Sequence, residues 1–196
     1  MTEAPIEKHP LEPFIPNDAK FLMLGSFPPK REKWSMEFFY PNWINDMWRI
    51  MGLVFHDDKE YFIDKAHGKR FDKDRIIRFC EEKGIALYDT ACEVRRLKDN
   101  ASDKFLEIVK ATDLRELLAK MPDCKTIIST GQKATDVIIE TFGCKEPSVG
   151  HTVNITLEND FNGDRQFWRM PSSSRAYPLA LDKKAEHYKR LFSNIL

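Results

Sequence analysis

Four short apolar runs, each bounded by turn-forming residues, constrain the fold of this 196-residue chain more than any other feature of its sequence. They occupy residues 21–27, 85–89, 126–130 and 166–170. Continuous apolar runs of this length are typical of strands that are buried on both faces of a parallel sheet. The sequence therefore predicts four buried strands.

Helix-type spacing of apolar residues separates these runs. The predicted helices occupy residues 43–54, 76–84, 105–121, 134–142 and 181–195. Strands that alternate with helices predict a parallel sheet with helices on both faces. Residues 153–157, with a turn at 162–164, predict a hairpin partner for the last strand. Four prolines predict an extended arm over residues 1–18, and residues 19–196 are expected to form a single domain.

Composition limits the classes of partner. The chain has 31 Lys and Arg residues and 31 Asp and Glu residues, so its net charge is zero. A zero net charge argues against binding to nucleic acid or membrane by bulk charge. It does not exclude a local basic groove. The four cysteines are far apart, so free thiols are expected rather than a zinc or iron–sulfur site. No signal peptide and no membrane span are recognisable. We therefore expect a cytoplasmic monomer that uses no metal and no other cofactor.

In a parallel sheet, ligands bind beyond the carboxyl ends of the strands. After the first run, Gly25 and the prolines that follow Phe27 form a rigid exit where a ligand can approach the backbone, although an ordinary turn is the alternative. After the last run, Ser172, Ser173, Ser174 and Arg175 are suited to phosphate or sugar contacts, with a simple polar turn as the alternative.

A third group of candidates follows the first exit. Residues 38–43 crowd several aromatic side chains, one of which could stack on a planar base, although a place in the core is the alternative. Asn45 and Asp46 come early in the next predicted helix. Their alternative role is helix capping or exposure on a solvated face.

Taken together and in chain order, these segments resemble the motifs of the uracil-DNA glycosylase superfamily, and most closely its mismatch-specific and hypoxanthine-DNA glycosylase-like branch. The matching segments are GSFPP at 25–29, FYP at 39–41, NDMW at 45–48, GIALYD at 84–89, TGQKA at 130–134 and MPSSSRA at 170–176. The resemblance covers the chain from about residue 21 onward.

The resemblance implies a three-layer α/β/α sandwich with a central four-stranded parallel sheet. It implies a monofunctional DNA glycosylase of base excision repair, whose partner is DNA with a damaged base of the uracil or hypoxanthine type. Such an enzyme flips the base out of the duplex, because the reacting atoms are inaccessible in the stack. Its site must stabilise negative charge on the leaving base and position a water below the sugar.

The resemblance also implies roles for individual residues. Phe27 stands where many members of the superfamily carry an Asp or Asn that orients the water. The resemblance therefore gives the catalytic role to Asn45, which matches the asparagine used by the hypoxanthine branch. The Asp46 carboxylate is the alternative. Phe39 or Tyr40 would stack on the base. The remaining expected contacts to substrate or DNA are Gly25, Ser26, Phe27, Pro28, Gly131, Ser172, Ser173, Ser174 and Arg175.

Two other functions stay open on the sequence. Because Phe27 replaces the usual polar residue, the chain could be a catalytically silent relative that binds nucleic acid. It could also be a different nucleotide hydrolase, because a fold does not determine a function. The sequence does not name the base that is removed.

Overall fold

The computed structural model describes residues 4–97, 105–156 and 163–195. Its main sheet contains five strands. In spatial order they are β3 (Ile85–Asp89), β2 (Phe21–Gly25), β6 (Thr126–Ser129), β8 (Arg165–Arg169) and β7 (His151–Ile155). The first four run parallel, and β7 joins β8 in antiparallel orientation.

The four predicted parallel strands are confirmed. The prediction that the sheet has four strands in all is wrong, because the structure shows five. The expected hairpin partner of the last strand pairs with β8 from His151 to Ile155 and so extends the sheet. Leu157 and Asn162, which belonged to that expectation, lie outside the described residues.

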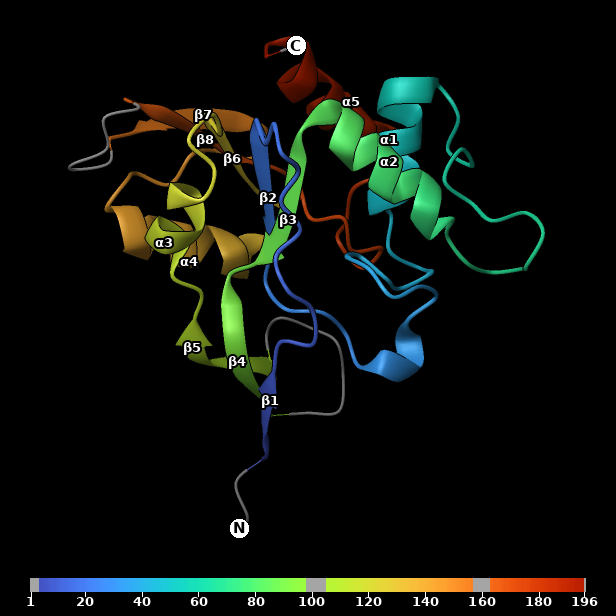
Figure 1. Ribbon diagram of the computed structural model, residues 1–196, viewed down its shortest axis with the longest axis horizontal. Coiled ribbons are helices and arrows are strands. Elements are labelled where there is room, and N and C mark those ends of the chain that lie inside the picture. The colour runs from blue at the N-terminus through green and yellow to red at the C-terminus, as the bar shows by residue number, and fades with distance from the viewer. Residues whose placement is uncertain (1–3, 98–104, 157–162, 196) are drawn as a thin grey trace.

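Helices cover both faces of the main sheet, which confirms the three-layer architecture (Figure 1). On one face lie α1 (Met47–His56), α2 (Lys73–Lys83) and α5 (Leu181–Ser193). On the other lie α3 (Leu114–Ala119) and α4 (Gln132–Phe142). A short 3-10 helix, η1 (Arg31–Lys33), follows β2.

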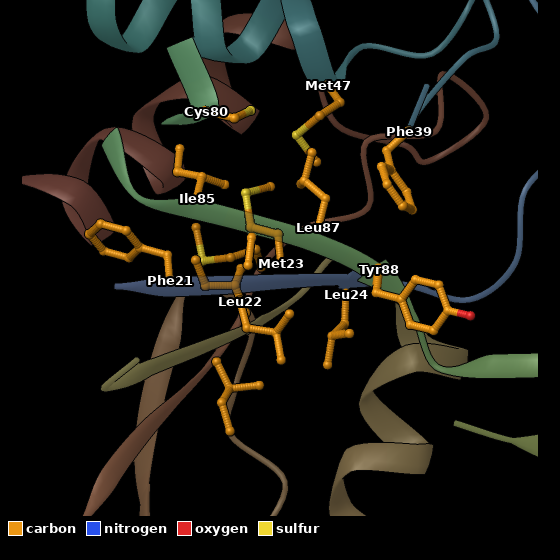
Figure 2. Packing of buried hydrophobic residues seen from close by; sticks show 14 of the residues in the cluster. Phe21, Leu22, Met23, Leu24, Phe39, Met47, Cys80, Ile85, Leu87 and Tyr88 are labelled. Carbon is orange, nitrogen blue, oxygen red and sulfur yellow. The ribbon is translucent and has the colours of Figure 1, made fainter. Parts of the chain in front are cut away.

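The core forms where the apolar strands meet these helices. Successive side chains of β2 point to opposite faces of the sheet, so Met23 lies on the side of Met47 from α1, while Leu22 lies on the other side (Figure 2). Phe21 contacts the Phe192 ring of α5, with centroids 5.3 Å apart. These residues are at most 2% exposed. The continuous apolar runs are therefore strands buried on both faces, as the sequence predicts.

A second, small sheet was not predicted. It is antiparallel, lies beyond the carboxyl ends of the main strands in Figure 1, and contains β1 (Ile6–Lys8), β4 (Ala91–Arg96) and β5 (Leu106–Ala111). The helix predicted over residues 105–121 is wrong in its first half, where β5 is found. Leu106 and Ile108 alternate along β5 and pack against the buried side chains of β4, and this tertiary contact outweighs the helical spacing.

The residues before β2 follow the open edges of these sheets. β1 pairs with β4, placing Lys8 opposite Glu93. Further along, Phe14 and Leu87 exchange two backbone hydrogen bonds of 3.0 and 2.9 Å. The prolines predicted an extended course, and the structure places this segment along β4 and the outer edge of β3.

Replacing Gly84 by alanine is expected to destabilise the protein more than the same change at Gly143. Both glycines end a helix, and both have φ of +66°. Each change costs about 1–2 kcal/mol because L-residues disfavour left-handed backbone. A Cβ at position 84 would also collide with the Asp18 carbonyl oxygen, whereas one at position 143 meets nothing within 4 Å. Urea unfolding should show an additional loss of about 1 kcal/mol for Gly84→Ala. Equal losses would contradict this packing.

Candidate active site

A cavity of about 780 Å³ opens at the carboxyl ends of the parallel strands. The chain leaves β2 toward β3 on one side and later returns to β6 on the other, so the strand order changes direction beside β2. Such a switch point is the usual ligand site of an open parallel sheet. The residues that line the cavity are Leu11, 25–29, Lys33, 39–42, Ile44, Asn45, Asp89, Thr130 and 172–178.

Most of the residues singled out from the sequence meet in this cavity. Those that line it are Gly25, Ser26, Phe27, Pro28, Phe39, Tyr40, Asn45, Ser172, Ser173, Ser174 and Arg175. Gly131 is absent from the lining, and its neighbour Thr130 takes that place. Asp46 is absent too, because it is buried behind the cavity wall with 6% exposure.

Asp89 and Gly25 lie side by side in the lining of the cavity. They are paired residues at the ends of β3 and β2. A Cβ on Gly25 would overlap Asp89 Oδ1, so glycine allows the carboxylate to lie over the end of β2. Asp89 Oδ2 lies 2.9 Å from His9 Nε2, and the Asp89 side chain is 10% exposed. Among the described residues that line the cavity, Asp89 is the only carboxylate.

Tyr40 joins the wall of the cavity to the end of β6. Its hydroxyl lies 2.9 Å from Thr130 Oγ1, which in turn lies 3.3 Å from the Leu24 carbonyl oxygen. Burial raises the pKa of the Tyr40 hydroxyl well above its usual value, and the nearby Asp89 carboxylate raises that pKa further. The hydroxyl therefore stays protonated near neutral pH and can donate to Thr130. Tyr40 has φ of +50°, an uncommon backbone conformation that the flanking contacts hold in place.

Asn45 lines the cavity. Its Oδ1 accepts a hydrogen bond of 2.8 Å from the Met47 N–H, so the amide orientation is set by that donor. Asn45 Nδ2 has no acceptor within residues 4–97, 105–156 and 163–195. Arg49 Nη1 donates to the Asn45 carbonyl oxygen at 2.9 Å, and its guanidinium lies 4.5 Å from the centre of the Trp43 ring. These contacts hold the segment before α1 in one conformation.

The serine-rich loop after β8 carries hydroxyls at the cavity edge. Ser172 Oγ accepts from the Ser174 N–H at 3.2 Å, and Ser174 Oγ accepts from the Ala176 N–H at 3.3 Å. A hydroxyl that accepts from the backbone still has its proton to donate to a ligand. Ser173 is buried, with 3% exposure. The loop thus offers donors suited to an anion.

A buried ion pair holds this loop against α1. Lys184 Nζ donates to Asp46 Oδ2 at 2.9 Å and to the Ser174 carbonyl oxygen at 2.7 Å. Asp46 Oδ1 lies 3.3 Å from Arg175 Nη2, and the Asp46 N–H donates to the Ser173 carbonyl oxygen at 2.9 Å. Both carboxylate oxygens of Asp46 are therefore paired within the protein.

Sequence analysis placed Asp89 and Thr130 among the residues just past the predicted strand ends but assigned them no role, and it missed His9. Asp89 and Thr130 were recognisable, because both stand at carboxyl ends of predicted strands. His9 had no such signal, since only the pairing of β1 with β4 brings it to the end of β3.

Two further findings concern partners. The four cysteines are free. Among the described residues, no group of three or more His, Cys, Asp and Glu side chains could hold a metal ion. Within the same residues, the helices are too short or too polar to cross a membrane.

The structure is that of a three-layer α/β protein with a cavity at the carboxyl edge of its sheet. No family model matches the chain, and no curated protein matches it. Among solved structures, it is similar to a solution NMR structure from Methanosarcina acetivorans that is described as a "putative uracil DNA glycosylase". The two chains share 19% sequence identity, with a TM-score of 0.63 and coverage of 96% of this chain and 98% of that one. This likeness shows that the fold is shared.

Proposed function

We propose that the chain is a DNA glycosylase of the uracil-DNA glycosylase superfamily, from the mismatch-specific or hypoxanthine-like branch. It would flip a base of the uracil or hypoxanthine type out of DNA and hydrolyse the N-glycosidic bond. The observation that supports this most is that residues of separate motifs, such as Gly25, Asn45 and Ser172, line one cavity at the switch point of the sheet. The neighbour of the same fold is described as a "putative uracil DNA glycosylase", with no branch named.

The walls of the cavity suit a flipped base. Phe39 and Tyr40 offer aromatic surface on which a planar ring can stack. Asn45 Nδ2 can donate to a carbonyl oxygen of the base. Water adds across the bond, so the sugar gains a hydroxyl and the departing base gains a proton. Negative charge builds on the base before it is protonated, and a fixed donor stabilises that charge.

We assign the catalytic role to Asn45 rather than to Asp46. Asp46 lies outside the lining of the cavity, and its two oxygens already pair with Lys184 and Arg175. Its negative charge is therefore balanced within the protein, and neither oxygen faces a substrate. We give Asp46 the task of holding the serine-rich loop.

The edge of the cavity suits the DNA backbone. Ser172 and Ser174 can donate to the phosphates beside the flipped nucleotide, and Arg175, with a side chain 54% exposed, can clamp the strand. Two to four such contacts predict a modest loss of affinity with salt, with a log–log slope of about −2 to −4. A modest slope agrees with a net charge of zero.

The proposal is tested with end-labelled duplexes that each carry one uracil, hypoxanthine, xanthine or mismatched thymine. Alkali after incubation cuts the strand at abasic sites. We expect cleavage at one class of base only, and none in an undamaged duplex. Retained binding without cleavage of any base would favour a silent relative that binds nucleic acid. Cleavage of free nucleotides, or strong competition by them, would favour a different hydrolase.

A further inference from the structure

His9 contacts Asp89 of the cavity lining from a segment distant in sequence. The pairing of β1 with β4 brings the chain to the end of β3, where the His9 N–H donates to the Cys92 carbonyl oxygen at 2.8 Å. The His9 side chain is 3% exposed. Its ring lies 5.3 Å from that of Phe27 and 4.7 Å from that of Tyr88. Two residues later, Leu11 lines the cavity.

The imidazole is fixed at both of its nitrogens. Nε2 lies 2.9 Å from Asp89 Oδ2. Nδ1 lies 2.8 Å from the carbonyl oxygen of Leu11 and 3.1 Å from its amide nitrogen. An ionised carboxylate only accepts hydrogen bonds, so Nε2 is the donor to Asp89. A ring held in this way by buried contacts cannot rotate without breaking them.

The carboxylate is fixed in turn. His9 holds Oδ2, and the absence of a side chain on Gly25 leaves room for Oδ1 over the end of β2. Asp89 lines the cavity with a side chain that is only 10% exposed, so we take it as the floor, whereas the exposed Ser174 and Arg175 mark the edge. A nucleotide whose phosphates stay at the edge inserts its base toward the floor. The base edge therefore meets Asp89 as a hydrogen-bond acceptor.

We propose that His9 is a positioning residue that holds the Asp89 carboxylate as the acceptor for an N–H group of the bound base. The proposal rests on the proposed function and assigns the residues that would select the base in the same site. The site would prefer bases in which an N–H adjoins a carbonyl, because Asp89 accepts from the N–H while Asn45 Nδ2 donates to an oxygen. Uracil, with N3–H, and hypoxanthine, with N1–H, both have this pattern. The nearby imidazole N–H also offsets the repulsion between a carboxylate and a departing base anion.

The test compares His9→Phe with His9→Gln in the full chain. Phenylalanine keeps a ring against Phe27 but loses the donor, whereas glutamine restores an N–H donor of similar reach. For each variant, kcat and KM are measured on the base that the wild type removes and on its N-methyl analogue. The N-methyl group blocks the atom from which Asp89 would accept. Thermal unfolding of each variant establishes that it is folded.

We expect the wild type to prefer the unmethylated base by about 10- to 100-fold, as a hydrogen bond to a charged group implies. The preference should fall toward unity in His9→Phe and in Asp89→Ala, and it should return in His9→Gln. A folded, active His9→Phe with the wild-type preference would overturn the proposal and leave the glycosylase assignment intact.

A binding measurement, which does not depend on catalysis, distinguishes failure of this proposal from failure of the proposed function. If no base is cleaved, calorimetry measures the binding of free uracil and free hypoxanthine to the wild type and to His9→Phe. Binding that weakens at least tenfold in His9→Phe and recovers in His9→Gln would support the proposal. Equal affinities, or no binding by the wild type, would overturn it.

Discussion

Replacing Asp46 by asparagine is expected to lower the free energy of unfolding by about 3–5 kcal/mol, because it leaves a buried ammonium without its counter-charge. The Lys184 side chain is 1% exposed and the Asp46 side chain 8%, with 2.9 Å between Nζ and Oδ2. Asparagine keeps the shape and removes only the charge. Asp46 makes no side-chain cap to α1, so lost capping cannot account for the effect. The total free energy of unfolding of a small domain is only about 5–15 kcal/mol, so this loss should be plain in urea unfolding.

The other end of the same helix supplies a matched control. Asp57 is exposed at the carboxyl end of α1 in the left-handed region, which asparagine tolerates. Asp57→Asn should change the stability by no more than about 0.5 kcal/mol. Adding Lys184→Met to Asp46→Asn should recover part of the loss, because the unpaired charge is then gone. A loss below about 1 kcal/mol in Asp46→Asn would show that the pair does not hold the loop.

The four parallel strands and the place of the cavity followed from local pattern. Runs such as residues 85–88 are apolar because both faces of their sheet are covered, and this signal is present in the sequence itself. The residues just past each run then had to share one edge of the sheet. That reasoning found Gly25 and Ser172, and applied to every strand end it also points to Asp89.

The small sheet and the place of His9 could not be read in this way. β5 is a strand because Leu106 and Ile108 find partners on β4, and those partners are 10 or more residues away in sequence. His9 depends on the same long-range pairing. For Asp46, sequence predicted a polar residue early in a helix, but its ion pair depends on Lys184, near the other end of the chain. These positions depend on contacts between segments that are distant in sequence, and the local spacing of apolar residues does not indicate such contacts.

Replacing Asn45 by alanine is expected to lower kcat for base release by about 10²- to 10³-fold, as the loss of one fixed donor to a developing anion does. Substrate affinity should change little, because Ser172 and Arg175 keep their contacts with the backbone of the DNA. Alanine also removes the acceptor for the Met47 N–H, at a cost of about 1 kcal/mol in stability. Single-turnover cleavage of the preferred duplex, with binding measured separately, resolves these effects.

Asn45→Asp separates capping from catalysis. Aspartate retains an oxygen for the Met47 N–H and caps as well as asparagine does, so stability should stay near that of the wild type. It replaces the donor that faces the cavity with a carboxylate oxygen, so base release should be at least as slow as in Asn45→Ala.

Asn42→Ala is the matched control, since Asn42 also lines the cavity with its Oδ1 engaged by a backbone N–H. Faster cleavage by Asn45→Asp than by Asn45→Ala would mean that position 45 orients the attacking water as an acceptor. The donor role would then be wrong, although the glycosylase assignment would stand.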